Sequence, residues 1–283
     1  MLNKKLKIEE LEKLAIEIRE EIIKMLLEAK SGHSAGSLGV VDILVALYFN
    51  ILNYDPKNLN LEDRDRFVLS NGHIVPALYA VLAYAGFFDK KELLSLRKLN
   101  SRLQGHPHRG SLAGIEVTSG PLGCGLSQAI GMALAAKLDN KKYQIYCLTS
   151  DGENQEGNFW EAMMFAGKHK LDNLTMIVDR NNIQIDGFTE EVMPLEPLKE
   201  KYEAFNWQVL EIDGNNISQV IEACNTSRAI YEKPVAIIAH TIPGKGVSFM
   251  EFDYTWHGKP PSPDEAQKAL KELRTLKGQI ETE

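Results

Sequence analysis

Two short apolar runs in the middle of the chain constrain its fold most strongly. The run YQIYCLTSD ends at Asp151, and the run LTMIVDRNN ends in Asp179, Asn181 and Asn182. Both runs are short, apolar and partly β-branched, as are strands that are buried on both faces of a sheet. A third run of this kind, PVAIIAHT, follows later in the chain. Because such strands need helices on each side, the runs predict a layered α/β fold.

Helical patterns precede and separate the predicted strands. The segment GNFWEAMMFAGKHK lies between the first two runs and predicts a helix that starts near Gly157 or Asn158. Strands alternating with helices indicate an α/β fold with a doubly wound, mostly parallel sheet and helices on both faces. We expect one more strand within 65–73 and further helices at 8–29, 37–52, 76–87, 126–138, 194–207 and 217–231.

The length of the chain and its apolar content limit the number of domains. The 283 residues, of which 44% are hydrophobic, can form one large core. We expect one α/β domain over residues 1–262 and a helical tail over residues 263–283. Ser262, Pro263 and Glu265 match the N-cap, first-turn and capping-box positions of a helix, so the tail is predicted to begin there.

Charge, hydropathy and cysteine usage argue against several classes of protein. The net charge is −7 and no block of basic residues stands out, which argues against nucleic-acid binding. No apolar run reaches the length of a membrane span, and the charged start MLNKKLKIEE does not resemble a signal peptide. Cys124, Cys147 and Cys224 form no CxxC pair, which predicts reduced thiols. We therefore expect a cytoplasmic protein that binds neither nucleic acid nor membrane.

Oxygen-bearing side chains stand where the first two strands are predicted to end. In a doubly wound sheet, ligands bind beyond the carboxyl ends of the strands. Oxygens from Asp151, Asn181 and a main-chain carbonyl suit Mg²⁺ or Ca²⁺, and the start of the following helix suits a pyrophosphate. The chain has no cluster of soft ligands that would favour zinc. Asp-Gly and Asn-Asn are also common turn pairs, so each alone could mark only a turn.

The stretch from Ser150 to Gly187 resembles the thiamine-diphosphate motif. That motif opens with Gly-Asp-Gly and closes about thirty residues later with Asn-Asn. Here Ser150 stands in place of the first glycine, while Asp151 and Gly152 remain. The stretches SGHSAGSLG, LSNGH, QGHP, GIEVTSGPLGCGLSQAIGMA, GKGVSFME and WHGKPP resemble transketolase and occur in that family's order. They span about residues 10–262, and the stretch TSGPLGCGLSQAIGMA resembles transketolase more than 1-deoxyxylulose-5-phosphate synthase.

The resemblance implies a role for each of several site residues. The implied catalytic residues, which would bind the hydroxyls of the donor sugar and move protons, are His33, His106 and His257. The implied metal ligands are Asp151, Asn181 and the main-chain carbonyl of Ile183. The implied cofactor-binding residues are His73, Gly120, Leu122, Asp151, Gly152, Glu156, Asn181, Ile185 and His257.

The cofactor contacts differ in kind. His73 and His257 would contact the diphosphate, and Gly120 and Leu122 would offer main-chain groups to the aminopyrimidine ring. Ile185 would press against the thiazolium ring; ordinary core packing is the alternative for this residue. Glu156 corresponds to an acidic residue near the dimer contact, or it is simply a carboxylate at a helix start. The loop SGPLGCG could also be only a tight turn that opens a helix at Leu126.

Not every histidine is assigned a role. A lone histidine in a loop is usually a surface residue, and His108 is expected to be one. His169 ends a helix, where a cation suits the helix dipole. His240 ends a predicted strand, and its role stays open.

The resemblance also implies an activity and an assembly. A transketolase transfers a two-carbon ketol unit from a ketose to an aldose, commonly pentose phosphates, with thiamine diphosphate and Mg²⁺; Ca²⁺ or Mn²⁺ are possible substitutes. No segment of this chain resembles the pyrimidine-binding domain of that family. We therefore expect the N-terminal subunit of a two-chain transferase that needs a C-terminal subunit carrying the pyrimidine and C-terminal domains.

The expected assembly is a heterotetramer, a homodimer of this chain with two partner chains. The helices VDILVALYF and FWEAMMFAG are candidate interface elements, with core burial as the alternative for each. Two other functions stay open: a component of another split thiamine-dependent enzyme, such as a 2-oxo acid dehydrogenase, and a cofactor-binding module without catalysis. The sugar-facing histidines favour the transketolase.

Overall fold

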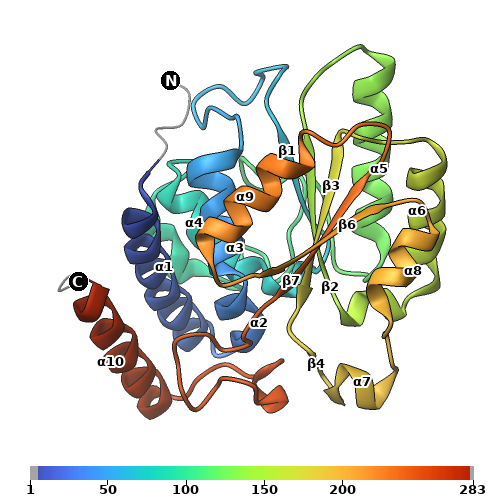
Figure 1. Ribbon diagram of the computed structural model, residues 1–283. Helices are drawn as coiled ribbons and strands as arrows, with labels where there is room; N and C mark the ends of the chain where they lie inside the picture. The colour runs from blue at the N-terminus through green and yellow to red at the C-terminus, as the bar shows by residue number, and fades with distance from the viewer. Residues whose placement is uncertain (1–5, 281–283) are drawn as a thin grey trace.

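A five-stranded sheet crosses the centre of the molecule (Figure 1). The computed structural model describes residues 6–280. The strand order is β1-β2-β3-β7-β6, and each neighbouring pair is parallel. The strands are β1 (Arg66–Leu69), β2 (Ile145–Ser150), β3 (Leu174–Arg180), β6 (Gln208–Asp213) and β7 (Val235–His240). The predicted doubly wound parallel sheet is therefore confirmed.

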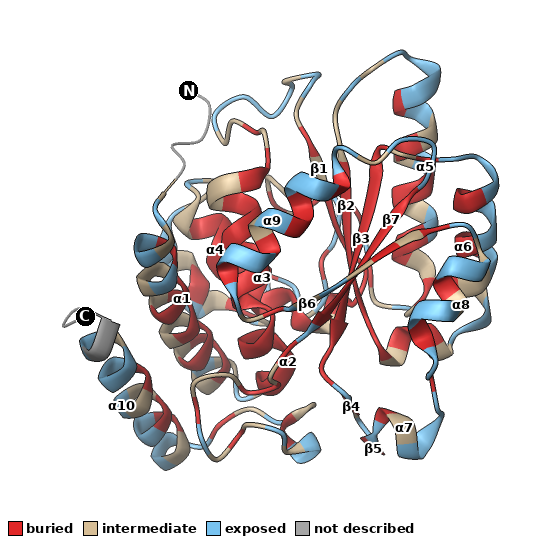
Figure 2. Cartoon of the chain, viewed as in Figure 1, coloured by how far each residue is buried: buried red, intermediate tan, exposed pale blue. Residues whose placement is uncertain are grey.

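Alternate residues of each strand point to opposite faces of the sheet, and each face has its own core. Phe67, Tyr146 and Ile177 belong to one core. Val68, Cys147 and Val178, each one position further along, belong to the other. Figure 2 shows these central strands as buried. Burial on both faces explains why the strand sequences are apolar throughout rather than alternating with polar residues.

Helices cover both faces of the sheet (Figure 1). The first core is covered by α1 (Ile8–Ala29), α3 (Val41–Ala46), α4 (Val75–Tyr84) and α9 (Ile217–Ser227). The second core is covered by α5 (Cys124–Leu138), α6 (Gly157–Lys168) and α8 (Leu198–Ala204). Within these, α1 and α6 begin where the sequence predicts, whereas α5 begins at Cys124 rather than Leu126.

The last helix, α10 (Pro263–Ile280), packs beside α1 (Figure 1). Its start carries the predicted capping box: the Ser262 N–H donates to Glu265 Oε2 at 2.8 Å, and the Glu265 N–H donates to Ser262 Oγ at 3.4 Å. Leu273 of α10 is fully buried in the first core. Lys277 Nζ lies 2.7 Å from Glu17 Oε1 of α1, so the two helices are also joined by charge.

The prediction of a single helix over residues 37–52 is wrong. The structure has α2 (Ser34–Gly39), then α3, and then a π-helical turn over Leu47–Ile51. A Cβ added to Gly39 would lie 3.0 Å from the carbonyl oxygen of Ile242, so another part of the chain approaches the backbone closely at the junction of α2 and α3. Residues 34–48 are all buried, and this packing overrides the simple helical period.

Three strands escape prediction from the sequence. In the edge strand β6 only Val209 is buried, and the strand carries the exposed Glu211 and Asp213, so its sequence resembles a polar loop. The other two, β4 (Ile183–Gln184) and β5 (Gly187–Phe188), form a two-residue antiparallel hairpin. Elements this short leave no period in the sequence.

The carboxyl ends of the parallel strands gather several segments at one edge of the sheet. The pairing places Ser150 opposite Asp179 and Arg180 opposite His240. The β4–β5 hairpin and α7 (Thr189–Val192) leave the sheet from this edge (Figure 1). This is the edge at which a doubly wound sheet binds its ligands.

Candidate active site

Asp151 stands at the end of β2 and joins it to the end of β3. Its carboxylate Oδ1 accepts a hydrogen bond from the Gly152 N–H at 2.7 Å, and its Oδ2 accepts from the Asn182 N–H at 2.7 Å. Arg180 Nη1 lies 3.0 Å from the same Oδ2. Burial raises the pKa of the Asp151 carboxyl, while Arg180 and the N–H donors oppose that rise.

Asn181 and Ile183 flank Asn182, whose N–H donates to this carboxylate. The Asn181 Oδ1 accepts a hydrogen bond from the Ile183 N–H at 3.0 Å, and its Nδ2 donates to Asp179 Oδ2 at 2.8 Å. Burial raises the pKa of Asp179 to about 7. Within residues 6–280, no group of three His, Cys, Asp or Glu side chains is placed to share a metal ion. A cation at this corner would therefore need amide and main-chain oxygens in addition to carboxylate oxygens.

Three of the predicted histidines meet although they come from distant parts of the chain. The ring centroid of His73 lies 5.0 Å from that of His33 and 5.1 Å from that of His257, and the latter two rings are 5.8 Å apart. His33 precedes α2, His73 lies in a 3-10 turn after β1, and His257 follows a 3-10 turn near the C-terminus. We call these three residues the histidine cluster.

Burial keeps the histidine cluster neutral near pH 7. Loss of water lowers the pKa of His33 to about 4, with His257 and Arg97 as further causes. Burial likewise places the pKa of His73 well below its ordinary value and lowers that of His257. Neutral imidazoles can accept protons or donate hydrogen bonds to a bound molecule.

Several buried polar atoms around the cluster have no hydrogen-bond partner among the described residues. They are the Nδ1 atoms of His33 and His257, both side-chain amide atoms of Asn71, and the Ser119 Oγ. Unpartnered buried polar groups cost free energy, so their concentration at one place indicates a bound molecule. Asn71 and Ser119 were not predicted, although both stand in the quoted stretches LSNGH and TSGPLG; nothing in their local sequence signals that they lose water.

His106 and Gly120 lie next to each other at the border of the cluster. A Cβ added to Gly120 would lie 3.8 Å from His106 Cδ2. Part of the His106 side chain is exposed; the burial of the rest and the charge of Arg97 lower its pKa. Its charge also contributes to the lowered pKa values of His33 and His73, so it lies within electrostatic reach of the cluster.

Ile185 links the histidine cluster to the Asp151 corner. It lies between β4 and β5, in the hairpin that begins at Ile183. A Cβ on Gly258 would lie 3.8 Å from the Ile185 side chain and 3.9 Å from His33 Cδ2. Ile185 is 64% exposed, so ordinary core packing is the wrong alternative for this residue. It presents an apolar wall beside the imidazoles.

The other predicted residues take less central places. Leu122 is half-buried in the loop before α5. Glu156 is exposed at the N-cap of α6 and makes no side-chain cap hydrogen bond. Its contact with the cofactor stays a prediction.

Two buried charged residues near the Asp151 corner were not predicted. Arg180 extends from Asp151 to Glu190 at 2.7 Å and to Glu196 at 3.0 Å, tying the end of β3 to the α7 segment. Glu153 is fully buried, and burial raises its pKa to about 7. The burial of these two residues could not be predicted from the sequence, because charged residues next to a turn normally face water.

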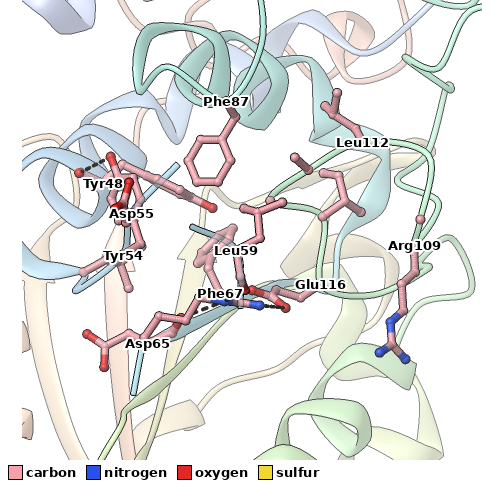
Figure 3. A pocket seen from close by; sticks show the side chains of 16 residues that line it. Tyr48, Tyr54, Asp55, Leu59, Asp65, Phe67, Phe87, Arg109, Leu112 and Glu116 are labelled. Carbon is pink, nitrogen blue, oxygen red and sulfur yellow. Dashed lines mark hydrogen bonds and ion pairs between the residues drawn. The ribbon is translucent and has the colours of Figure 1, made fainter. Parts of the chain in front are cut away.

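A separate cavity of about 410 Å³ contains none of the predicted site residues (Figure 3). Tyr48, Tyr54 and Phe87 contribute ring contacts to its wall. Its Arg64 and Glu116 pair with each other, with Nη2 and Oε2 3.0 Å apart. These two charges are thus already balanced, whereas the histidine cluster has unpartnered atoms. We place the candidate site at the cluster.

A known protein family matches almost the whole of the chain. Residues 11–277 match the family described as "Transketolase, thiamine diphosphate binding domain". Among curated relatives, an apulose-4-phosphate transketolase subunit of Phocaeicola vulgatus is 40% identical over 98% of this chain and 99% of its own length. The 6-deoxy-6-sulfo-D-fructose transketolase subunit SqwG of a Clostridium species is 41% identical over 90% of this chain and 93% of its own length.

A solved structure shares the fold. The transketolase of Campylobacter jejuni superposes with a TM-score of 0.89 and 34% identity, covering 97% of this chain and 46% of the solved chain. This chain therefore spans less than half of that transketolase. No helix within residues 6–280 has the length and apolar content needed to cross a membrane. The chain belongs to the transketolase family of enzymes, as its thiamine-diphosphate-binding domain.

Proposed function

We propose that this chain is the N-terminal subunit of a two-chain transketolase that transfers a two-carbon ketol unit from a ketose or ketose phosphate to an aldose or aldose phosphate. The observation that carries the proposal is the histidine cluster, whose neutral rings meet with two unpartnered Nδ1 atoms. Relatives of nearly the same length are named as transketolase subunits, which supports the two-chain form.

In this proposal the Asp151 corner would hold a divalent ion together with a diphosphate. Asp151, Asn181 and the carbonyl of Ile183 would bind Mg²⁺, with Ca²⁺ or Mn²⁺ as substitutes, because their oxygens are the hard ligands these ions prefer. The unpartnered Asn71 and His257 atoms would gain partners from the bound cofactor. Thiamine diphosphate, when bound, supplies the carbanion chemistry, and the protein supplies placement and charge.

The histidines would then serve the sugar. His33, His106 and His257 have pKa values lowered chiefly by burial, so each is a neutral ring able to accept a proton from a donor hydroxyl near pH 7. Ile185 would shield the reacting end of the site from water. A 2-oxo acid has no such hydroxyl pattern, and this favours a sugar over the other split thiamine-dependent enzymes.

The partner would be a C-terminal subunit carrying the pyrimidine-binding and C-terminal domains. We propose that two copies of this chain form a dimer and that two partner chains complete a heterotetramer. Of the two predicted interface helices, α6 retains exposed apolar residues, Met164 at 60% and Phe165 at 41%. The segment VDILVALYF is instead buried within the chain's own core, so we withdraw it as an interface element.

The proposal includes a cytoplasmic location. Cys124, Cys147 and Cys224 are all free of disulfides. Such thiols suit a reducing compartment. Neither a nucleic acid nor a membrane is part of the proposed assembly.

An activity assay tests the proposal. The chain is purified alone and together with a chain that carries a pyrimidine-binding domain, sought first in the neighbouring reading frame. Both samples receive thiamine diphosphate, Mg²⁺, ribose 5-phosphate and a panel of donors: xylulose 5-phosphate, apulose 4-phosphate, 6-deoxy-6-sulfofructose and a 2-oxo acid. We expect ketol transfer from a sugar donor only when both chains are present.

Each other outcome has a distinct meaning. Turnover by this chain alone would contradict its role as a dependent subunit. Turnover of the 2-oxo acid but of no sugar donor would assign the chain to another split enzyme. Cofactor binding without turnover of any donor would support the alternative of a non-catalytic binding module.

A further inference from the structure

Glu153 is a fully buried carboxylate that the proposed chemistry does not use. It lies in the 3-10 turn Gly152–Gln155, directly after the Asp151 corner. All its hydrogen-bond partners within residues 6–280 are neutral donors. Burying a carboxylate without a neighbouring cation costs free energy unless several hydrogen-bond donors compensate its charge. The role of Glu153 is therefore to be sought in the segments that supply these donors.

The donors come from three different segments. Glu153 Oε1 accepts hydrogen bonds from the Gly123 N–H, at 2.6 Å, and from the Ser70 hydroxyl. Its Oε2 accepts from the Ser150 N–H at 3.3 Å. The Ser70 Oγ accepts in turn from the Gly125 N–H at 3.1 Å, which extends the network to the first turn of α5.

Each of these segments leads directly into the candidate site. Ser70 follows β1 and precedes Asn71 and His73. Gly123 ends the loop that contains Gly120 and Leu122. Ser150 is the residue before Asp151. The two oxygens of a single carboxylate thus connect the three turns that carry the proposed cofactor contacts.

Two glycines allow the segments to approach each other closely at this junction. A Cβ on Gly125 would lie 2.6 Å from the Ser70 Cα, so the start of α5 touches the turn after β1. Gly123 has φ +81°, and a Cβ there would overlap Asn158 Oδ1. The start of α5 therefore meets the backbone after β1 at contact distance, and Gly123 lies against the Asn158 side chain; Glu153 supplies acceptors to both segments.

We infer that Glu153 is a positioning residue that sets the affinity for the diphosphate cofactor by fixing three turns of its site, without touching the cofactor itself. This inference rests on the proposed function. The ionised carboxylate is suited to the place because it only accepts hydrogen bonds, and all three of its partners here donate. A glutamine has the same shape, but its NH₂ group would face one of the N–H donors.

The test compares Glu153→Gln with the exposed control Glu203→Gln in the assembly of both chains. The dissociation constant of thiamine diphosphate is measured by direct titration at fixed Mg²⁺, well below the melting temperature. We expect it to rise by at least about tenfold in Glu153→Gln and to stay unchanged in the control. We expect kcat at saturating cofactor and KM for the ketose to change by less than about threefold.

A second variant keeps the test decisive if Glu153→Gln does not fold. Ser70→Ala retains the Glu153 carboxylate but removes the Ser70 hydroxyl, which donates to Glu153 and accepts from the Gly125 N–H. We expect this variant to weaken cofactor binding about threefold or more. Unchanged cofactor affinity in the folded variants, even with a lowered melting temperature, would reduce Glu153 to a structural residue and overturn the inference. If the wild-type assembly bound no cofactor, the proposed function would fail as well, so the two failures are distinguishable.

Discussion

At the scale of single residues, loss of water sets the charge of the site. Burial lowers the pKa of His33 to about 4 and raises the pKa of Asp179 to about 7. The first shift keeps an imidazole neutral, and the second brings a carboxyl into range of a proton near pH 7. Both pKa values therefore differ from their ordinary values for the same physical reason, because burial removes the hydration of the charged form.

His33 should make stability depend on pH between about 4 and 6.5. Its pKa is about 4 in the folded chain against an ordinary value of 6.5. Between these values the unfolded chain binds more protons, so the stabilisation present above pH 6.5 is lost as the pH falls toward 4. The variant His33→Asn has no imidazole to protonate, so it should not show this loss of stability. Urea unfolding at several pH values should show the wild type losing stability relative to the variant on acidification.

The exposed residue Gln267, which does not titrate, provides the control for that measurement. Gln267→Asn should keep the pH dependence of the wild type. Equal slopes for the wild type and His33→Asn would show that the His33 imidazole does not remain neutral in the folded chain.

Asp151→Asn should weaken metal-dependent cofactor binding without unfolding the chain. The amide cannot supply the negative charge that a divalent ion requires, and Arg180 keeps Glu190 and Glu196 as partners. We expect the affinity for Mg²⁺ with thiamine diphosphate to fall by more than about tenfold, a factor that even supporting residues of metal sites commonly reach. Calorimetric titration measures it, with Asp139→Asn on the surface as the control. Retained affinity would exclude Asp151 as a ligand.

At the scale of elements, long periodic segments were predicted well and short or edge elements were not. α1 follows its apolar period from Ile8 to Ala29, and α10 starts at the predicted capping box. β6 was missed because an edge strand with Glu211 and Asp213 resembles a loop. The helix predicted over 37–52 is divided into shorter pieces, because contacts with residues distant in the chain decide its course.

The packing of α10 on α1 should contribute measurably to stability. Leu273 of α10 is fully buried in the first core. Leu273→Ala leaves a cavity and should lower the free energy of unfolding by about 2–5 kcal/mol. Lys268→Ala, at an exposed position of the same helix, should change it by no more than about 0.5 kcal/mol. Equal small effects in urea unfolding would mean that α10 is not part of the cooperative core.

At the scale of the whole molecule, the sheet brings distant segments to one edge. The histidine cluster combines residues 33, 73 and 257, and the Asp151 corner combines the ends of β2 and β3. The resemblance to transketolase predicted these groups, and the structure supplies their distances. It also adds Asn71, Ser119, Arg180 and Glu153, to which the sequence assigned no role.

Cofactor and metal together should stabilise the chain. A ligand that binds only the folded state at a hundredfold excess over its dissociation constant adds about 2.7 kcal/mol to the free energy of unfolding. Thermal melting with thiamine diphosphate and Mg²⁺ should therefore show a raised Tm, and EDTA should reverse it. Thiamine without the diphosphate is the control and should have little effect, because the Asp151 corner binds phosphate through the metal. An equal shift with thiamine would place the main contact elsewhere.

The amino-acid sequence by itself determined the α/β class, the strands that end at Asp151 and Asp179, and the family resemblance. Hydrophobic period, capping residues and motif spacing are local properties, so they can be read along the chain. Only the tertiary structure decided which histidines are neutral, which polar atoms lack partners, and which carboxylate joins the turns of the site. Burial and hydrogen bonding arise between segments far apart in the chain, and residues such as Glu153 and Ser70 acquire their environment only when those segments meet.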